Sequence, residues 1–552
     1  MTKIKKVLSV ALVLLFSCSA FSFAMEKDDP IMLRGIRPMG MGGAFTAVAD
    51  DENAVFYNPA GIAQRSGQLI QIFNINTAIS GDTIKAASDA MNTFGNLSDG
   101  SDGSTIADDF IKVKDTIADR DLSFMLSLVN PAYISAPISV GKSSNTVSFG
   151  IGIFNSVNIG VRAGMQIPRF MLDFIQLAAA GDFNDDSSFL NAIGDSMLGG
   201  VLNPGVSVSD VRAAVAAGED WSSISHYFSG DFITLVNDIQ TIIDNSALSD
   251  GEKYSQITDA LNTFATAPNR GAWSMEGTYA KATVNSYATA TLDVPFSYKF
   301  DFLEALHIPG KLSLGANLKY IQRAKFSETV RIERDQIKQL LDGDDIETVI
   351  DTKVGASYGQ GFGLDFGALY SLNQRLHFGL QVSDVLTNIN YSRGYSFNDT
   401  YPDSDFTHTA YIAPQVNIGV SYIPENILGW NPQNRLMVAA DIRDIFGAYT
   451  DSFQNHIHIG AEYRYGCLAL RAGLNQLRPA FGLGLEFNVF QLSYAYYGEE
   501  STLARMIGDT ATVYYHQFLL SFKIGHNQGR KIASVPAKEE AKQEAPAPAK
   551  SK

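Results

Sequence analysis

The sequence contains very little cysteine, with Cys18 and Cys467 the two examples in 552 residues. Cys18 falls in a segment that we expect to be removed as a secretory signal, so the mature chain would keep Cys467 alone. A single cysteine excludes an intrachain disulfide and any metal site built from cysteines. The mature fold therefore depends on no covalent cross-link.

An excess of basic residues is also absent. The chain has 42 Lys and Arg against 58 Asp and Glu, a net charge of −16 that becomes −19 once three signal lysines are removed. This sign of charge argues against nucleic acid as a partner. Catalytic patterns are missing as well, since the eight histidines are scattered and no G-x-S-x-G elbow precedes a helix. We therefore predict no enzyme and no cofactor.

Residues 1–24 have the three parts of a secretory signal. Three lysines come first, an apolar stretch covers residues 7–16, and small residues precede a cleavage site after Ala24. A loose lipoprotein box ending at Cys18 leaves lipoprotein processing open as an alternative. No later stretch has the long apolar run of a membrane helix.

The remainder of the chain alternates apolar residues with small or polar ones, which is typical of β-strands with two different faces. In residues 357–371, for example, apolar side chains occupy every second position from Phe362 to Tyr370. Fourteen segments of this kind can be assigned, at 68–76, 121–139, 145–156, 276–297, 311–324, 357–371, 376–387, 411–423, 435–446, 456–465, 467–475, 480–488, 490–498 and 513–525.

The lengths of the connections between these segments follow a rule. The odd-numbered connections are long, with 476–479 the short exception, whereas most even-numbered ones are turns of a few residues. Alternation alone would also suit a soluble sandwich. Sorted connections favour an all-β transmembrane antiparallel β-barrel over residues 68–525, with short turns and the N-terminus on the periplasmic side. The longest external loops, 77–120 and 157–275, carry amphipathic helical patterns.

The most unusual stretch is Arg34–Gln64, which precedes the first strand. Its cluster of small residues lets the backbone lie very close to another surface. Apolar spacing then predicts a short helix over Gly43–Asp50, and Asn58-Pro59 is a typical helix start. We predict that residues 25–67 form a plug, or hatch, inside the barrel. Its candidate functional residues are the glycines Gly40, Gly42 and Gly43, the acidic cluster Asp50, Asp51 and Glu52, and the motif Asn58, Pro59 and Ala60.

The run DENAVFYNPAGIA, with Asn58-Pro59-Ala60, resembles the N-terminal hatch of the long-chain fatty acid transporter family of outer-membrane barrels, the FadL/TodX type. It is equally similar to the hatch of a related barrel family that includes a porin-like subunit of the type IX secretion system, the PorV type. The first resemblance implies an outer-membrane location, external helical loops with a weak binding groove, and passive passage of hydrophobic molecules. It also implies a kink in the third strand, for which Gly150 and Gly152 are the candidates.

Charged residues on the lumen face of the predicted strands are the other candidates. An inward Arg or Lys could hold a ligand carboxylate, or it could form ion pairs with the wall and with the acidic end of the hatch. The four candidates are Arg443, Arg464, Arg471 and Lys523. His456, His458 and Glu462 share one strand face, where a polar lumen is a simpler explanation than zinc, so we predict no metal.

The tail after residue 525 is rich in Ala, Pro, Lys and Glu, a composition that cannot bury a core. We predict that residues 526–552 are disordered in the periplasm, with contact to a periplasmic or envelope protein as an alternative role. The usual family member ends on an aromatic residue of its last strand, and this chain departs from that pattern. The expected partners are outer-membrane lipid and a hydrophobic ligand, and the rival hypothesis is a barrel that acts as a protein-interaction subunit.

Overall fold

The structure is a computed structural model. It describes residues 26–31, 34–64, 68–88, 120–139, 146–166, 187–248, 250–265, 279–300, 309–333, 355–396, 407–424, 434–450, 452–487, 489–501 and 511–525. The predicted signal (1–24) and the predicted tail (526–552) lie outside these residues, so both stay predictions.

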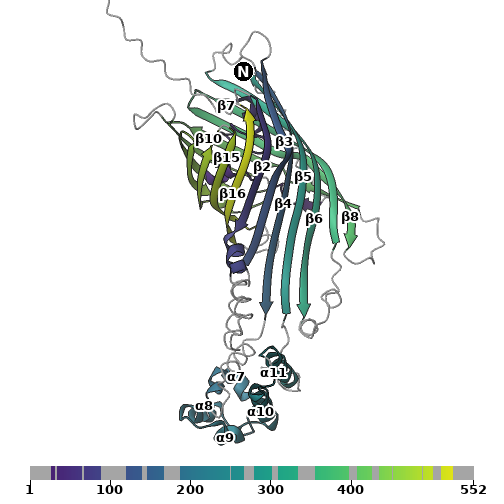
Figure 1. The fold of residues 1–552 in the computed structure, drawn as a ribbon, viewed down its shortest axis with the longest axis vertical. Coiled ribbons are helices and arrows are strands. Elements are labelled where there is room, and N and C mark those ends of the chain that lie inside the picture. The colour runs from purple at the N-terminus through teal and green to yellow at the C-terminus, as the bar shows by residue number, and fades with distance from the viewer. Residues whose placement is uncertain are drawn as a thin grey trace, which may run out of the picture.

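Fourteen antiparallel strands, β2 to β8 and β10 to β16, close a barrel in the described part of the chain (Figure 1). Each strand pairs with the next, and β16 closes the ring by pairing with β2. The bounds are β2 Leu69–Ser80, β3 Arg120–Ser139, β4 Thr146–Gln166, β5 Tyr279–Phe300, β6 Lys311–Glu333, β7 Gly355–Ser371, β8 Leu376–Ser396, β10 Gln415–Tyr422, β11 Asn434–Ile442, β12 Ile457–Tyr465, β13 Leu468–Asn475, β14 Arg478–Glu486, β15 Phe490–Glu500 and β16 Thr512–Gly525.

This architecture confirms the predicted fourteen-stranded barrel, and each predicted strand overlaps one observed strand. Strand length differs around the wall, whereas transmembrane strands commonly have about 9–11 residues. Strands β3 to β8 have 17 to 23 residues, whereas β10 to β15 have 8 to 11. The tall strands extend at the end that carries the long connections, called here the long-connection end. The predicted loop 157–275 accordingly starts only after Gln166.

Two further strands lie at the long-connection end. Strand β9 (Thr407–Ile412) pairs with the distal half of β8, and β1 (Glu26–Asp28) pairs with β9 in parallel. The first described residues therefore lie near the long-connection end. The prediction that the N-terminus is on the short-turn side is wrong for these residues, because β1 extends a sheet edge that β9 leaves open.

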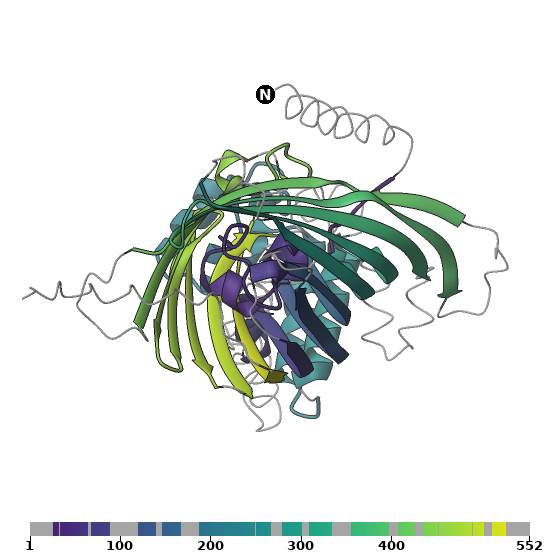
Figure 2. The ribbon, with the colours of Figure 1, turned by 90° about the horizontal axis from the view of Figure 1, so that it is seen from above.

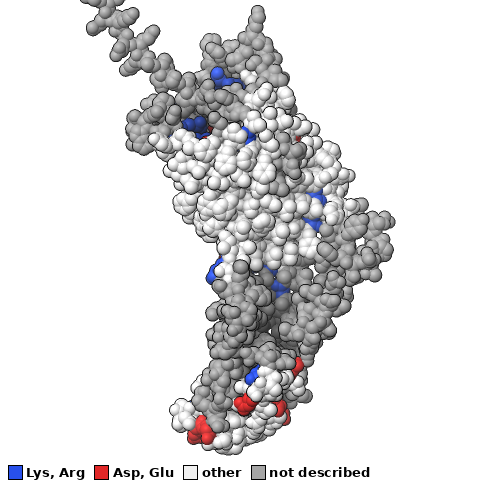
Figure 3. Space-filling view, in the orientation of Figure 1, with Lys and Arg blue, Asp and Glu red and all other residues white. Residues whose placement is uncertain are grey.

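The barrel alternates as a two-faced wall should. Outward positions carry large exposed apolar side chains, such as Phe366, Phe378, Leu470 and Phe518, while inward positions are buried. Figure 3 shows that the middle of the barrel presents few charged atoms on the visible face. A belt of this kind is the surface expected for contact with lipid. None of the described helices is long and apolar enough to span a membrane.

Residues 34–64, named here the lumen segment, lie inside the ring of strands (Figure 2). They form α2 (Ile36–Gly40), α3 (Ala54–Tyr57) and the 3₁₀-helix η1 (Pro59–Gln64). The predicted helix over Gly43–Asp50 is wrong, since those residues form turns. Gly42 and Gly43 have φ of 63° and 80°, a left-handed conformation that ends a helix. The glycines thus close a helix that comes before them.

A separate helical unit occupies residues 187–265, beyond the long-connection end in Figure 1. Its elements are η2 Ser188–Ala192, α7 Asp195–Gly199, α8 Val208–Ala216, α9 Trp221–Ile224, η3 Ser225–Tyr227, α10 Gly230–Asp244 and α11 Asp250–Ala265. Helices α8 and α10 agree with the helical patterns expected in the loop 157–275. The unit has its own apolar core, in which Phe232 is fully buried against Phe228 and Phe264. Another short 3₁₀-helix, η5, covers Phe453–His456.

This separate core makes a prediction. Phe232→Ala should destabilise the helical unit by about 3–5 kcal/mol, because it removes a buried aromatic ring and leaves a cavity. Hydrogen exchange should accelerate over residues 187–265 and stay unchanged in the barrel strands. The exposed Asp238→Ala in the same helix is the control. Equal acceleration in the barrel would contradict an independent core.

Candidate functional site

The lumen segment rests on glycines of the barrel wall. Gly315 of β6 and Gly367 of β7 are register partners, and a Cβ on either would collide with the Asn58-Pro59-Ala60 backbone or side chains. On the other side of the lumen, Gly460 and Gly473 are partners that face Met41 and Gly42. A Cβ on Gly482 would lie 3.0 Å from the Gly40 Cα. At these glycines the wall presents backbone alone to the segment.

Asn58 holds the predicted motif in this slot. Its side-chain nitrogen donates to the Thr46 carbonyl at 2.9 Å and to the Ala368 carbonyl of β7 at 3.1 Å. Its side-chain oxygen accepts from the Ala60 backbone N–H at 3.1 Å, which is the geometry of a helix cap. Asn58 is fully buried, so each of these hydrogen bonds replaces a contact with water that the fold removes. Asn58 therefore acts both as the helix cap and as the residue of the motif that links the segment to the wall.

Arg37 is the centre of the segment's charged contacts, and sequence reasoning assigned it no role. Its guanidinium donates to both carboxylate oxygens of Glu462 on β12 at 2.8 Å. The third nitrogen donates to Asp50 at 2.5 Å and to Asp51 at 2.9 Å. Arg37 is 4% exposed, and a planar guanidinium suits this forked arrangement. Burial would lower the pKa of Arg37, but the carboxylates raise it well above its usual value.

The acidic cluster contacts three cations. Asp50 and Asp51 bind Arg37, and Asp50 also lies 3.5 Å from Arg435 of β11, whereas Glu52 accepts from Lys523 of β16 at 2.7 Å. Burial raises the pKa of the Asp51 carboxyl and its neighbour Glu52 raises it further, which outweighs the lowering by Arg37. The Lys523–Glu52 ion pair has the form expected if wall cations bind the acidic end of the segment.

Wall cations around Glu462 complete the network. Arg464 and Arg471 each donate to Glu462 at 2.8 Å and also bind Glu486. Three of the four predicted carboxylate contacts, Arg464, Arg471 and Lys523, are therefore engaged by protein carboxylates. Arg443 differs, since it forms no ion pair with a carboxylate in the described part of the chain, and its guanidinium lies 5.2 Å from the Tyr57 ring centroid.

Two wall residues, Asp441 of β11 and His458 of β12, also bind the segment. The Asp441 carboxylate accepts from the backbone N–H groups of Phe45 and Thr46 at 2.7 Å. His458 makes a hydrogen bond of 2.9 Å to the Gly42 carbonyl, and His456 makes one of 2.9 Å to the Arg443 carbonyl. Across the described residues, no group of three or more His, Cys, Asp or Glu is arranged to hold a metal ion.

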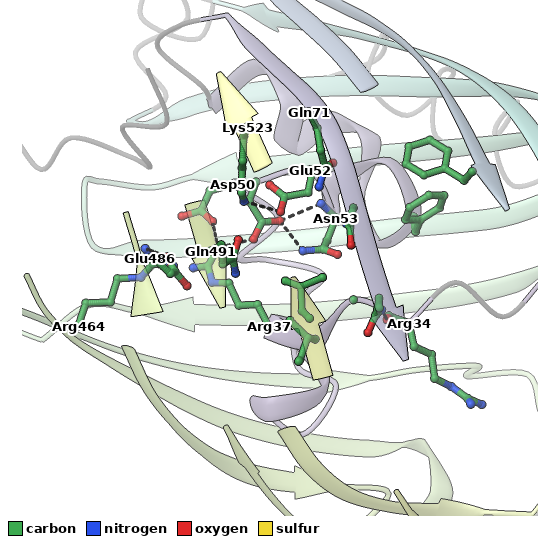
Figure 4. A pocket seen from close by; sticks show the side chains of 18 of the residues that line it. Arg34, Arg37, Asp50, Glu52, Asn53, Gln71, Arg464, Glu486, Gln491 and Lys523 are labelled. Carbon is green, nitrogen blue, oxygen red and sulfur yellow. Dashed lines mark hydrogen bonds and ion pairs between the residues drawn. The ribbon is translucent and has the colours of Figure 1, made fainter. Parts of the chain in front are cut away.

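Two cavities flank the segment. The first has a volume of about 80 Å³ and lies beside Arg37, Glu52 and Lys523, with Phe56 and Phe154 on its apolar side (Figure 4). The second, of about 210 Å³, is named here the Arg443 cavity, and Met39 and Tyr57 contribute to its lining. Both are smaller than the roughly 300–1,000 Å³ of a typical small-molecule site.

Gly150 and Gly152, the predicted kink, lie in a stretch of irregular pairing. The β3–β4 register shifts between Val129 and Tyr133, opposite this part of β4. A Cβ on Gly152 would lie 2.8 Å from the Phe154 ring and 3.0 Å from the Tyr133 ring. These glycines therefore make room for two aromatic side chains beside the segment, and an exit through the wall stays a prediction.

A second anchor near the N-terminus was not found from the sequence. Asp28 of β1 binds Arg323 at 3.1 Å and Lys325 at 3.2 Å, both on β6. Burial would raise the pKa of the Asp28 carboxyl, but Arg323, Lys325 and the Tyr391 hydroxyl together lower it. The alternation of β6 could have shown that Arg323 and Lys325 point into the lumen. Nothing in the sequence shows that Asp28 is their partner.

The glycine slot makes a prediction. Gly367→Ala should push Asn58 out of place, because the added methyl group overlaps its side chain, at a cost of about 1–3 kcal/mol. Amide exchange over residues 54–64 should accelerate, whereas Gly81→Ala, whose Cβ meets nothing closer than 3.8 Å, should leave it unchanged. Equal exchange in the two variants would exclude a tight slot.

The Arg37 network makes another prediction. Arg37→Ala leaves Asp51 buried without its cation and Asp50 with only the more distant Arg435, which should cost about 3–5 kcal/mol. The segment should loosen, and conductance across a planar bilayer should rise while the barrel remains folded. Arg37→Lys should restore little, since an ammonium cannot make the fork. Lys311→Ala, which changes an exposed wall residue, is the control. Unchanged conductance in Arg37→Ala would show that Arg37 does not hold the segment in place.

No model of a known protein family matches the sequence, and no curated protein matches it. Among solved structures, the chain is similar to the Pseudomonas putida toluene transporter TodX, with 12% identity, 89% of this chain and 98% of that chain covered, and a TM-score of 0.35. It is also similar to the Ralstonia pickettii toluene transporter TbuX, with 11% identity, 91% and 99% coverage and a TM-score of 0.31. A Pseudomonas aeruginosa FadL homologue gives 10% identity, 90% and 98% coverage and a TM-score of 0.33. The fold assignment rests on the strand pairing, to which similarities at these TM-scores add nothing.

Proposed function

We propose that the protein is an outer-membrane barrel that passes hydrophobic small molecules, most specifically long-chain fatty acids or similar lipids with an acidic head group. The apolar outer belt supports a place in a membrane, and the resemblance of the Asn58-Pro59-Ala60 run supports the class of cargo. In this proposal the lumen segment is the hatch that keeps the barrel shut between passages. The signal over residues 1–24 would direct the chain across the inner membrane.

The observation that carries the proposal is the Arg443 cavity. Arg443 is half-buried and forms no ion pair with a described carboxylate, while Arg464, Arg471 and Lys523 are already neutralised. Met39, Phe56 and Tyr57 of the lumen segment supply apolar surface to the same cavity. Carboxylates such as Asp444 and Glu499 also line the cavity. Arg443, which none of the described carboxylates pairs with, would bind the carboxylate of a fatty acid, and the apolar side chains would contact the first part of its chain.

Passage through this lumen requires the segment to move. The Arg443 cavity of about 210 Å³ holds only part of a long-chain lipid, since sites for such ligands reach roughly 300–1,000 Å³. A ligand that binds the moved state better than the closed state would shift the population toward it. The mechanism is therefore passive: capture at Arg443, displacement of the segment, and release as the segment returns. Gly150 and Gly152 stay candidates for an exit through the wall.

Arg443→Gln tests the proposal. Loss of a charge-assisted hydrogen bond, worth about 1.5–3 kcal/mol, should weaken binding of a fluorescent long-chain fatty acid by roughly ten- to a hundredfold. Binding of the matching fatty alcohol should change little, because it has no carboxylate. Lys311→Gln, at the other end of the wall, is the control. The absence of saturable fatty-acid binding by the unmodified protein, measured by fluorescence titration, would reject the proposal.

The rival function, a barrel that serves as a protein-interaction subunit, has one observation in its favour. The helical unit over 187–265 has its own core and carries an excess of acidic residues, such as Asp231, Asp238 and Asp259. A unit of this kind could present a docking surface outside the barrel. The two functions differ in what accompanies the protein: a transporter should purify from outer-membrane extracts largely alone, whereas a subunit should bring a stoichiometric partner with it.

A further inference from the structure

The outer face of the tall wall carries a row of six uncharged side chains, of which five are polar. The row crosses six strands in register, from β4 to β9, and is named here the amide row. Its members are Asn155, Ala290, Gln322, Gln360, Asn390 and Thr409. Four of the six are amides. Cross-strand neighbours on one face lie about 5 Å apart, so these side chains form one ladder.

The next row toward the short-turn end has a different character. It consists of Ile153, Leu292, Tyr320, Phe362, Asn388 and Tyr411, and is therefore mostly apolar and aromatic. The row beyond it includes Ile151 and Leu318, both about half exposed. Aromatic residues border the apolar band of membrane barrels at the interface with water. The amide row thus follows these apolar rows toward the long-connection end, where β4 adds one more exposed apolar residue, Ile159.

The amide row lines a concave surface with a volume of about 890 Å³. The outward residues contribute side chains to it, whereas their inward neighbours Arg323 and Tyr391 are 3% and 1% exposed and fill the lumen side. The concavity is therefore on the outside of the barrel. Ala288 and Ala324 leave space in the following row, and Tyr358 is 50% exposed at its border. Its volume is within the roughly 300–1,000 Å³ of small-molecule sites.

Hydrogen bonds hold several of these side chains in place. The Tyr320 hydroxyl donates to Gln360 Oε1 at 3.0 Å, and Gln322 Nε2 donates to the Tyr320 hydroxyl at 3.3 Å. Thr409 Oγ1 donates to Asn390 Oδ1 at 2.7 Å. Side chains ordered before binding lose less entropy when a ligand arrives. The row is therefore partly preorganised.

The chemistry of the lining selects among ligands. An amide offers two donors and an acceptor, which match adjacent hydroxyl groups of a sugar ring, and the Tyr358 ring offers a flat face to the C–H side of that ring. A phosphate group would call for Arg or Lys, and the lining side chains on the outer face carry no charge. A hydrocarbon chain would leave the amides without partners.

We infer that the amide row binds the sugars of an outer-leaflet glycolipid, namely the core oligosaccharide of lipopolysaccharide, while the acyl chains of that lipid cover the apolar belt. The inference rests on the proposed place of the barrel in the outer membrane. It adds a site on the outer wall that is separate from the lumen and from Arg443.

Binding of lipid by the full-length protein in detergent tests the inference, with native mass spectrometry as the readout. The probes are lipopolysaccharide with a complete core, lipid A without core sugars, and the core oligosaccharide released from its lipid. The unmodified protein should prefer intact lipopolysaccharide to lipid A. The double variant Gln360→Ala/Asn390→Ala should lose about tenfold of the affinity for lipopolysaccharide, as expected for two lost hydrogen-bonding groups, and keep its affinity for lipid A. Gln374→Ala, an exposed amide at the short-turn end, should behave as the unmodified protein.

Three results would overturn the inference. One is equal affinity for lipopolysaccharide and lipid A, another is an unchanged affinity in the double variant, and the third is equally tight binding of the released oligosaccharide, which would make the ligand a soluble sugar. Fatty-acid binding separates this inference from the proposed function. A loss of fatty-acid binding alone would leave the amide row standing, whereas a protein that stays soluble without detergent would overturn both.

Discussion

The arrangement of the lumen depends on one constraint: buried charges must be neutralised by partners at short range. Arg37 is the clearest example, because it binds two carboxylates of its own segment and also Glu462 of the wall. Glu462 in turn neutralises Arg464 and Arg471. A charge left alone in such a place would cost several kcal/mol. The segment and the wall are therefore joined in one network of ion pairs, in which Glu462 is the residue they share.

Close packing makes this unit possible. Charged side chains reach each other only because the backbone of the segment lies directly on the wall, at Gly315, Gly367, Gly460 and Gly473. Glycine weakens a strand because it adds no side chain to the packing. Here the neighbouring backbone fills that space, and the hydrogen bonds of Asn58 and Asp441 replace the missing side-chain contacts. The lower stability of a glycine-containing strand is offset by the contact between the strand and the segment.

The sequence predicts the strands well and the contacts between distant residues poorly. Strand β7 was expected at 357–371 and is observed at Gly355–Ser371, because alternation is a local signal. Strand β4 was expected to end at residue 156, yet it continues to Gln166. The polar Asn155 interrupts the outward apolar series, although alternation resumes at Val157, Ile159 and Val161, so the strand end was placed too early. Arg37 and Asp28 escaped notice because their partners are hundreds of positions away, and no local pattern records a register between them.

The path of the chain through the barrel has a mechanical consequence. Strand β1 is attached near the long-connection end, and the lumen segment continues from there to β2, which starts at the short-turn end. The segment is therefore attached to the wall at both ends of the barrel. Complete withdrawal to the short-turn side would draw β1 through the whole lumen, past the Arg37 network. Sideways displacement between two fixed ends breaks fewer contacts, so the topology itself favours a segment that shifts within the barrel over one that leaves it.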